Sequence, residues 1–168
     1  MIPTRQTERL VLRSLTQEDL TTYAAILGQR EVSRYLGDGK QKTREDAAHL
    51  LTRFQEQWME YGYGVWGVVE RSTNQLIGHC GFSRLPTGDV ELLYAFDPTT
   101  WGKGYAVESA QEALEFLDLL AGIGPIIALS YPENERSQRV LVRLGFTYMK
   151  EDDYAGVNLL VYQRHTTG

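Results

Sequence analysis

The sequence predicts a mixed α/β domain with a largely antiparallel central sheet of about seven strands, flanked by about four helices. Strand-like apolar runs are interspersed with amphipathic segments that begin at helix caps. Three consecutive strand-like runs are separated only by short turns, which favours antiparallel pairing. The sequence lacks the repeated strand–helix–strand order that builds doubly wound nucleotide-binding folds.

The N-terminal part contains one predicted strand and two predicted helices. The strand is centred on residues 10–12, within Thr7–Leu15. Thr16–Asp19 resembles a capping box, so a helix is expected to run to about Leu27. Thr43–Asp46 repeats this signal before a longer helix. The apolar face of that helix has residues at helical spacing: Ala47, Leu50, Leu51, Phe54 and Trp58.

The rest of the chain supplies most of the predicted sheet. The expected strands are Val65–Glu70, Gln75–Arg84, Asp89–Phe96, Ile126–Ser130, Phe146–Lys150 and Val157–Arg164. A glycine turn precedes an amphipathic helix that ends at about Leu120. A further helix is expected over Asn134–Leu144, with Gly145 as its C-terminal stop.

Composition and length limit the possible classes of protein. The chain has 168 residues without a repeat or composition break, so residues 1–168 are expected to form a single domain. A net charge of −5 and the lack of a dense basic tract argue against nucleic-acid binding. No apolar run reaches the roughly 18 residues that cross a membrane. The lone cysteine, Cys80, predicts a small buried hydrophobe and a reducing, cytoplasmic compartment.

The most informative segment is Trp101–Ala106, which follows the apolar run Val90–Phe96 and opens a helix. A helix N-terminus carries unpaired N–H groups and a positive dipole end, which favour phosphate. The segment is neither a dinucleotide fingerprint, because the third glycine is missing, nor a Walker loop. Taken alone, it fits a phosphate site and a plain strand-to-helix turn equally well.

Trp101–Ala106, Thr7–Arg13 and Asn134–Ser137 are three motifs that together resemble those of the GNAT superfamily of acetyl-CoA-dependent N-acetyltransferases. Trp101–Ala106 fills the frame of the family's pyrophosphate loop, Gln/Arg-x-x-Gly-x-Gly/Ala, with Trp101 at the Gln/Arg place. A loop that begins with tryptophan in this way is similar to the loop of the branch that contains the ribosomal-protein N-terminal acetyltransferases. Thr7–Arg13 and Asn134–Ser137, the latter followed by Leu144–Phe146, resemble the same branch.

The resemblance implies a GNAT-like acyl-CoA N-acyltransferase fold and acetyl-CoA as the co-substrate. Backbone N–H groups from about Gly102 to Ala106 would bind the pyrophosphate, and the strand near Tyr94–Phe96 would splay from its neighbour to bond the pantetheine arm. Asn134 would reach the pantetheine, a role compatible with its plain interpretation as a helix N-cap. The predicted cofactor-binding residues are Tyr94, Ala95, Phe96, Trp101, Gly102, Lys103, Gly104, Tyr105, Ala106 and Asn134.

Glu91 is the predicted general base. It is the only charged residue within Val90–Phe96, a strand that is otherwise apolar on both faces. Partial desolvation there would raise its pKa towards a useful value, and it could then take a proton from the attacking amine. The alternative is an edge carboxylate paired with an arginine.

The general acid is predicted less directly. Many GNAT enzymes place a tyrosine seven residues after the helix-start asparagine, but this chain has Leu141 there. In the similar branch a serine three residues after the asparagine is implicated as the proton donor, which implies Ser137. Its alternative is a polar residue in the first helical turn. Catalysis without an acid also stays open, because a thiolate leaves readily.

Other side chains have weaker functional interpretations. Arg136, Arg139 and Arg143 form one helical stripe that could meet the CoA 3′-phosphate, although a solvated face is the plainer explanation. Five aromatic residues could shape an amine site, although core packing is the plainer explanation for most of them: Tyr35, Trp58, Tyr61, Tyr63 and Trp66. His79 has no evident catalytic partner, and no residue spacing resembles a metal site.

The predicted reaction is transfer of acetyl from acetyl-CoA to a primary amine by direct attack in a ternary complex. The acceptor is a protein N-terminus or a small-molecule amine, and the protein is a monomer or homodimer. Two alternatives remain. One is a non-catalytic acyl-CoA-binding or regulatory module, and the other is a detoxifying acetyltransferase for aminoglycosides or polyamines.

Overall fold

The computed structural model describes residues 1–165, so the last three residues of the predicted domain lie outside the described part. The helices are α1 (Leu20–Leu27), α2 (Arg30–Ser33), α3 (Arg44–Tyr61), α4 (Tyr105–Asp118) and α5 (Glu135–Arg143). The strands are β1 (Arg5–Gln6), β2 (Leu10–Arg13), β3 (Val65–Glu70), β4 (Gln75–Arg84), β5 (Val90–Phe96), β6 (Ile126–Ser130), β7 (Thr147–Tyr154) and β8 (Val157–Arg164).

The strands form one eight-stranded sheet in the order β1-β2-β3-β4-β5-β6-β8-β7. Every neighbouring pair is antiparallel except β5 and β6, which run parallel. The predicted mixed α/β class with a largely antiparallel sheet is therefore confirmed. The two-residue β1 and the four-residue α2 were not predicted, because neither is long enough to show a periodic pattern.

Local signals placed the long helix α3 correctly. The Thr43 hydroxyl accepts from the Asp46 N–H at 3.1 Å, and the Asp46 carboxylate accepts from the Thr43 N–H at 2.8 Å. This capping box satisfies two of the N–H groups that a helix start leaves unpaired. The helix ends at Gly62, whose φ of +75° is a left-handed conformation that glycine adopts without strain.

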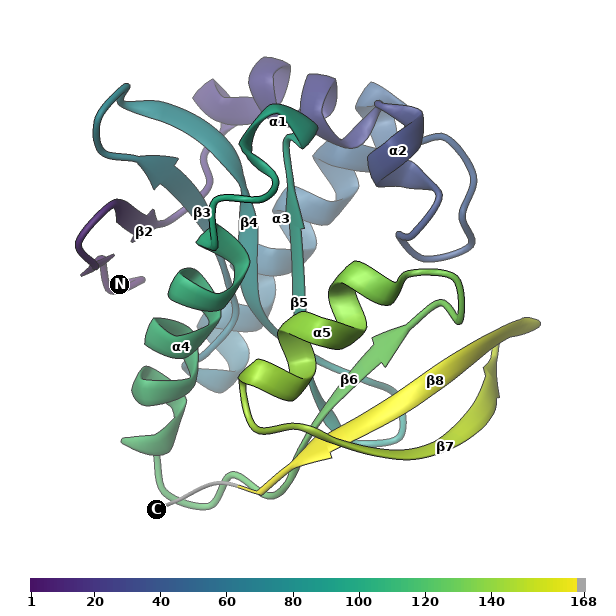
Figure 1. Ribbon diagram of the computed structural model, residues 1–168. Helices are drawn as coiled ribbons and strands as arrows, with labels where there is room; N and C mark the ends of the chain where they lie inside the picture. Colours follow the sequence, from purple (N-terminus) through teal and green to yellow (C-terminus); the bar gives the residue numbers. More distant parts are fainter. Residues whose placement is uncertain (166–168) are drawn as a thin grey trace.

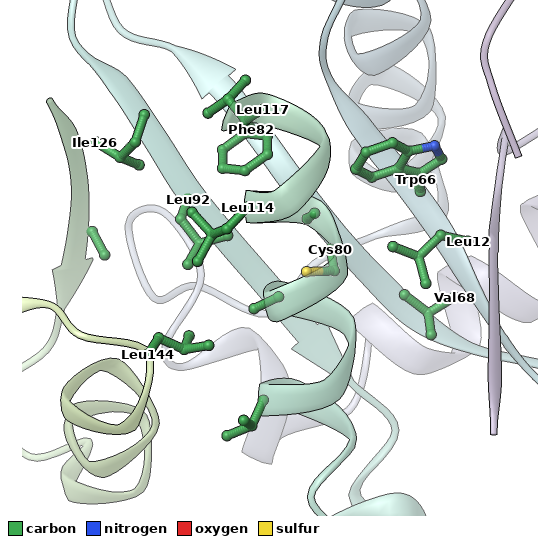
Figure 2. Packing of buried hydrophobic residues seen from close by; sticks show 14 of the residues in the cluster. Leu12, Trp66, Val68, Cys80, Phe82, Leu92, Leu114, Leu117, Ile126 and Leu144 are labelled. Atoms are coloured by element: carbon green, nitrogen blue, oxygen red, sulfur yellow. The ribbon is translucent and has the colours of Figure 1, made fainter. Parts of the chain in front are cut away.

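Helices cover both faces of the sheet (Figure 1). Helix α4 packs on one face, over a core that includes Trp66, Phe82 and Leu114 (Figure 2). Helices α1 and α3 cover the other face, where Tyr23 and Leu51 are buried. Cys80 lies fully buried beneath α4, and so its prediction as a small core hydrophobe is confirmed.

The sheet opens between β5 and β6. Strand β5 pairs with β4 along its whole length, but with β6 only at Val90 and Glu91. Beyond these residues β6 continues alongside β8, and α5 follows it. The far half of β5 therefore has a paired edge facing β4 and an open edge facing the gap, where an extended ligand can bind as a further strand would.

Candidate active site

The open edge of β5 exposes particular backbone groups. Bonds from Leu85 N–H to Asp89 and from Asp97 N–H to Ile77, both 2.8 Å, flank the β4–β5 ladder. Since antiparallel pairing alternates, odd-numbered residues of β5 turn their amides to β4 and even-numbered residues turn theirs away. The backbone groups of Tyr94 and Phe96 therefore face the gap. Those of Ala95, also predicted to bind pantetheine, face β4.

The glycine turn after β5 has the backbone geometry of an anion-binding helix start. Gly102 and Gly104 have φ values of +79° and +83°, which side chains strongly disfavour. Gly104 is the N-cap of α4, so the N–H groups of Tyr105 and Ala106 have no partner within the helix. A Cβ built on Gly102 meets nothing within 4 Å, so the requirement for glycine there is conformational.

The side chains of the turn hold the start of α4 in place. The Tyr105 ring is buried, and its hydroxyl donates to Oε2 of Glu70 at 2.6 Å. This bond holds the pKa of the Glu70 carboxyl below its usual value. The ammonium of Lys103 lies 4.0 Å from the same oxygen and is half-exposed. Lys103 thus already has a carboxylate beside it, which reduces the charge that it offers to a phosphate.

The N-terminal motif fixes the same helix from another side. Arg9 Nε donates to Oε1 of Glu108 at 2.7 Å, and the Thr7 hydroxyl donates to Oε2 at 2.6 Å. The Arg9 guanidinium also lies 4.5 Å from the centre of the Tyr105 ring. Glu108 lies in the first turn of α4, where a free carboxylate would compete with a bound anion. The motif therefore anchors the start of α4 and neutralises the charge of Glu108.

Trp101 joins the turn to α5. Its indole Nε1 donates to the carbonyl oxygen of Phe96 at 2.9 Å, and the Arg136 guanidinium lies over its ring at 4.2 Å from the centroid. The tryptophan that replaces the family's Gln/Arg thus brings a cation from α5 to the edge of the glycine turn. Arg136 is the residue of the predicted arginine stripe that contacts the turn.

Glu91 lies on the face of the sheet that α3 covers, opposite the face covered by α4. It is half-buried and pairs in register with Ser83. Burial raises its pKa to about 7, while the positive charge of Arg53 on α3 acts in the opposite direction. Among the described residues, no cation lies within ion-pairing distance of it, which favours the interpretation as a base over that as a paired edge carboxylate.

The first turn of α5 faces the open edge of β5. The side-chain oxygen of Asn134 accepts from the Ser137 N–H at 3.3 Å, so Asn134 is an N-cap, and its amide nitrogen remains available to a ligand. The hydroxyl oxygen of Ser137 lies 2.8 Å from that of Tyr94. Leu141 is buried in the core. The structure therefore brings Asn134, Ser137 and Tyr94 together at the gap.

His79 and the two tryptophans of the aromatic group are structural. His79 is buried, with Nδ1 at 2.7 Å from the Tyr23 hydroxyl, and burial lowers its pKa to about 4. Trp58 and Trp66 are core residues that donate to the carbonyl oxygens of Val65 and Pro3. Core packing is thus confirmed for both tryptophans.

A groove of about 530 Å³ that sequence reasoning missed lies along α3 and the loop before it. Arg53 lines it, and this arginine also acts on Glu91, so the groove and the carboxylate share one side of the sheet. The only sequence signal was a short run rich in glycine and charge, residues 37–42. The lining residues are Asp38, Lys40, Gln41, Lys42, Asp46, His49, Leu50 and Arg53.

Two further observations bear on the class of site. Within residues 1–165, no group of three or more His, Cys, Asp or Glu side chains is placed to hold a metal ion. No described helix is long and apolar enough to span a membrane. The arrangement can hold an elongated, phosphate-bearing molecule along β5, with a carboxylate of raised pKa on the opposite face of the same strand.

Comparison with known proteins identifies the class. A family model described as an acetyltransferase (GNAT) domain matches residues 9–147, most of the chain. The chain therefore belongs to the GNAT acetyltransferase family, as the sequence motifs predicted. It is accordingly an N-acetyltransferase, the activity named for several of its relatives.

The relatives cover most of the chain. The uncharacterized N-acetyltransferase YoaA of Bacillus subtilis (strain 168) is 31% identical over 148 residues, covering 87% of this chain and 84% of that protein. A solved acetyltransferase from Agrobacterium tumefaciens (strain C58) has a TM-score of 0.85 at 25% identity, covering 98% of this chain and 95% of that one. A ribosomal L7/L12 alpha-N-protein acetyltransferase solved with coenzyme A shares the fold, with a TM-score of 0.79 at 18% identity, covering 98% and 97%.

Proposed function

We propose that the protein transfers an acetyl group from acetyl-CoA to a primary amine, by direct attack within a ternary complex in the cytoplasm. The observation that carries this proposal is the open edge of β5 beside the glycine turn. The pyrophosphate would lie against the N–H groups at the start of α4. The pantetheine amides would bond the exposed backbone of Tyr94 and the N–H of Phe96, whose carbonyl oxygen already accepts from Trp101, with Asn134 reaching from α5.

The acetyl carbon would then lie between two different chemical environments. Glu91, on the face towards α3, takes the proton that the amine must lose before it can attack. Ser137, on the other side, lies near the departing sulfur. Much of the rate comes from holding the amine and thioester in contact, since this reaction needs little covalent assistance from the protein.

The acceptor enters by the groove along α3, because that groove and Glu91 lie on the same side of the sheet. The groove is open and carries charges of both signs, which suits a flexible, polar segment. A relative from Escherichia coli (strain K12), 28% identical over 115 residues, is named a ribosomal protein uS5-alanine N-acetyltransferase. We therefore propose a protein N-terminus as the acceptor, with a small-molecule amine as the alternative.

The test is turnover of acetyl-CoA with a panel of N-terminal peptides, polyamines and aminoglycosides, measured as thiol release. Release with at least one amine supports the proposed function. Binding of CoA without thiol release for any amine supports the non-catalytic acyl-CoA-binding module. Failure to bind CoA contradicts both, and a preference for polyamines or aminoglycosides over peptides identifies the detoxifying enzyme.

Replacing Arg136 with glutamine is expected to weaken CoA binding by about tenfold, or about 1.4 kcal/mol. The change removes the cation that Trp101 holds beside the glycine turn. Isothermal titration with CoA checks this prediction, and the affinity of the variant should depend less on salt than that of the wild type.

Arg139→Gln is the matched control, because it removes an exposed arginine from the same helix without the Trp101 contact. Equal losses in the two variants would mean that α5 acts only through its overall charge. Unchanged affinity in Arg136→Gln would show that the stacked guanidinium does not reach the phosphates.

A further inference from the structure

The proposed donor site uses the backbone of Tyr94 and leaves its side chain unassigned. This phenol reaches from β5 to the first turn of α5. Its oxygen lies 2.8 Å from Oγ of Ser137 and 3.4 Å from the carbonyl oxygen of the same residue. The shorter contact, between the two hydroxyls, is the better hydrogen bond.

We propose that Tyr94 is a positioning residue that orients the Ser137 hydroxyl towards the sulfur of the departing CoA. The inference rests on the proposed function. A hydroxyl has one hydrogen, so when Tyr94 donates its hydrogen to Oγ of Ser137, the serine hydrogen stays free to donate into the gap. The two hydroxyls then form a directed chain from phenol to serine to sulfur.

The charge of the reaction develops where this chain ends. The amine nitrogen forms a bond to the acetyl carbon, the carbon–sulfur bond breaks, and its electron pair remains on sulfur. The proton of the amine passes to Glu91. A hydrogen-bond donor already aimed at the sulfur stabilises the thiolate without reorganising during the reaction.

Tyr94 also supplies a hydroxyl group that α5 lacks at position 141. Leu141 is 1% exposed and packed in the core, so that position offers no hydroxyl to the gap. The phenol comes instead from the neighbouring strand and meets the same helix one turn earlier. Burial raises the pKa of the Tyr94 phenol above its usual value, so this group keeps its hydrogen and acts as a donor.

The experiment compares Tyr94→Phe, Ser137→Ala and the double variant, with two readouts. The first is kcat and KM for acetyl-CoA with an active amine. The second is the pKa of the thiol of bound CoA, titrated by the ultraviolet absorbance of the thiolate. Tyr162→Phe, which removes a phenol hydroxyl from β8, is the control.

In both single variants kcat is expected to fall by about tenfold while KM changes little. The double variant should lose no more than Ser137→Ala, because the two hydroxyls act as one chain. The pKa of the bound thiol should rise by about one unit in all three, since each change either removes the Ser137 hydroxyl or leaves it without the bond that orients it towards the thiolate. The control should retain wild-type values.

The readouts separate the inference from the function on which it rests. Wild-type kcat and wild-type thiol pKa in Tyr94→Phe overturn the inference, as do losses that add up in the double variant. A phenol that only supports the fold would lower thermal stability without moving the thiol pKa, which also overturns it. A wild-type protein that binds no CoA overturns the proposed function itself.

Discussion

Glu91→Gln is expected to lower kcat for acetyl transfer by about 10²- to 10⁴-fold, the range over which positioned general bases contribute. The substitution keeps the size and polarity of the side chain but removes its ability to take a proton. In the wild type the rate should rise with pH through about 7, because the raised pKa of Glu91 leaves it protonated below that value. Steady-state kinetics over this pH range check both expectations.

In Glu91→Gln, the increase of the rate with pH should disappear, in addition to the fall in kcat. A residual activity that climbs only with the pKa of the free amine would show that the acceptor then sheds its proton to water. Affinity for CoA should be unchanged, because Glu91 lies on the face opposite the α4 start. An unaltered pH profile in Glu91→Gln would mean that another group takes the proton.

The burial of His79 is expected to lower the free energy of unfolding by about 3 kcal/mol when the pH falls from 6.5 to about 4. Its pKa drops from 6.5 in the unfolded chain to about 4 in the folded protein, because the ring is buried against Tyr23 and Phe54. Over this window the unfolded state binds the proton and the native state does not. Stability therefore falls as the pH falls.

Glu91 opposes this trend. Its pKa rises from 4.5 to about 7 on folding, so the native state binds the extra proton and stability falls as the pH rises through the same window. In the wild type, the two contributions to the slope of stability against pH largely cancel. Denaturant unfolding between about pH 5 and 6.5 should therefore be nearly independent of pH.

Single substitutions should expose each slope. His79→Gln leaves stability that falls with rising pH, whereas Glu91→Gln leaves stability that rises with it. His49→Gln is the matched control, because it removes a histidine whose side chain is exposed. A wild type that loses stability steeply on acidification, with no change in His79→Gln, would contradict this account.

Features that depend on neighbours along the chain were predictable. The Thr43–Asp46 cap and the glycine turn each act within a few residues, so their sequence signals are complete in themselves. Glu91 could also be selected as a candidate from the sequence, because an isolated charge in an apolar strand is visible without knowing what surrounds it. Helix α2 was not, since four residues carry no period.

Other parts of the site depend on contacts between distant segments. Thr7 and Arg9 stood out as a motif, but the carboxylate that they bind, Glu108, lies about a hundred residues away. The backbone that faces the gap follows from the register of β5 against β4, which gives this role to Tyr94 and not to Ala95.

The sequence by itself determined the fold class, the order of elements and the glycine turn that opens α4, because capping, turn conformation and apolar periodicity are local properties of the chain. The tertiary structure decided which edge of β5 is open, on which face of the sheet Glu91 lies, and that Tyr94 meets Ser137. Those relations depend on strand order and on contacts across the sheet, where the two partners have no fixed spacing in sequence.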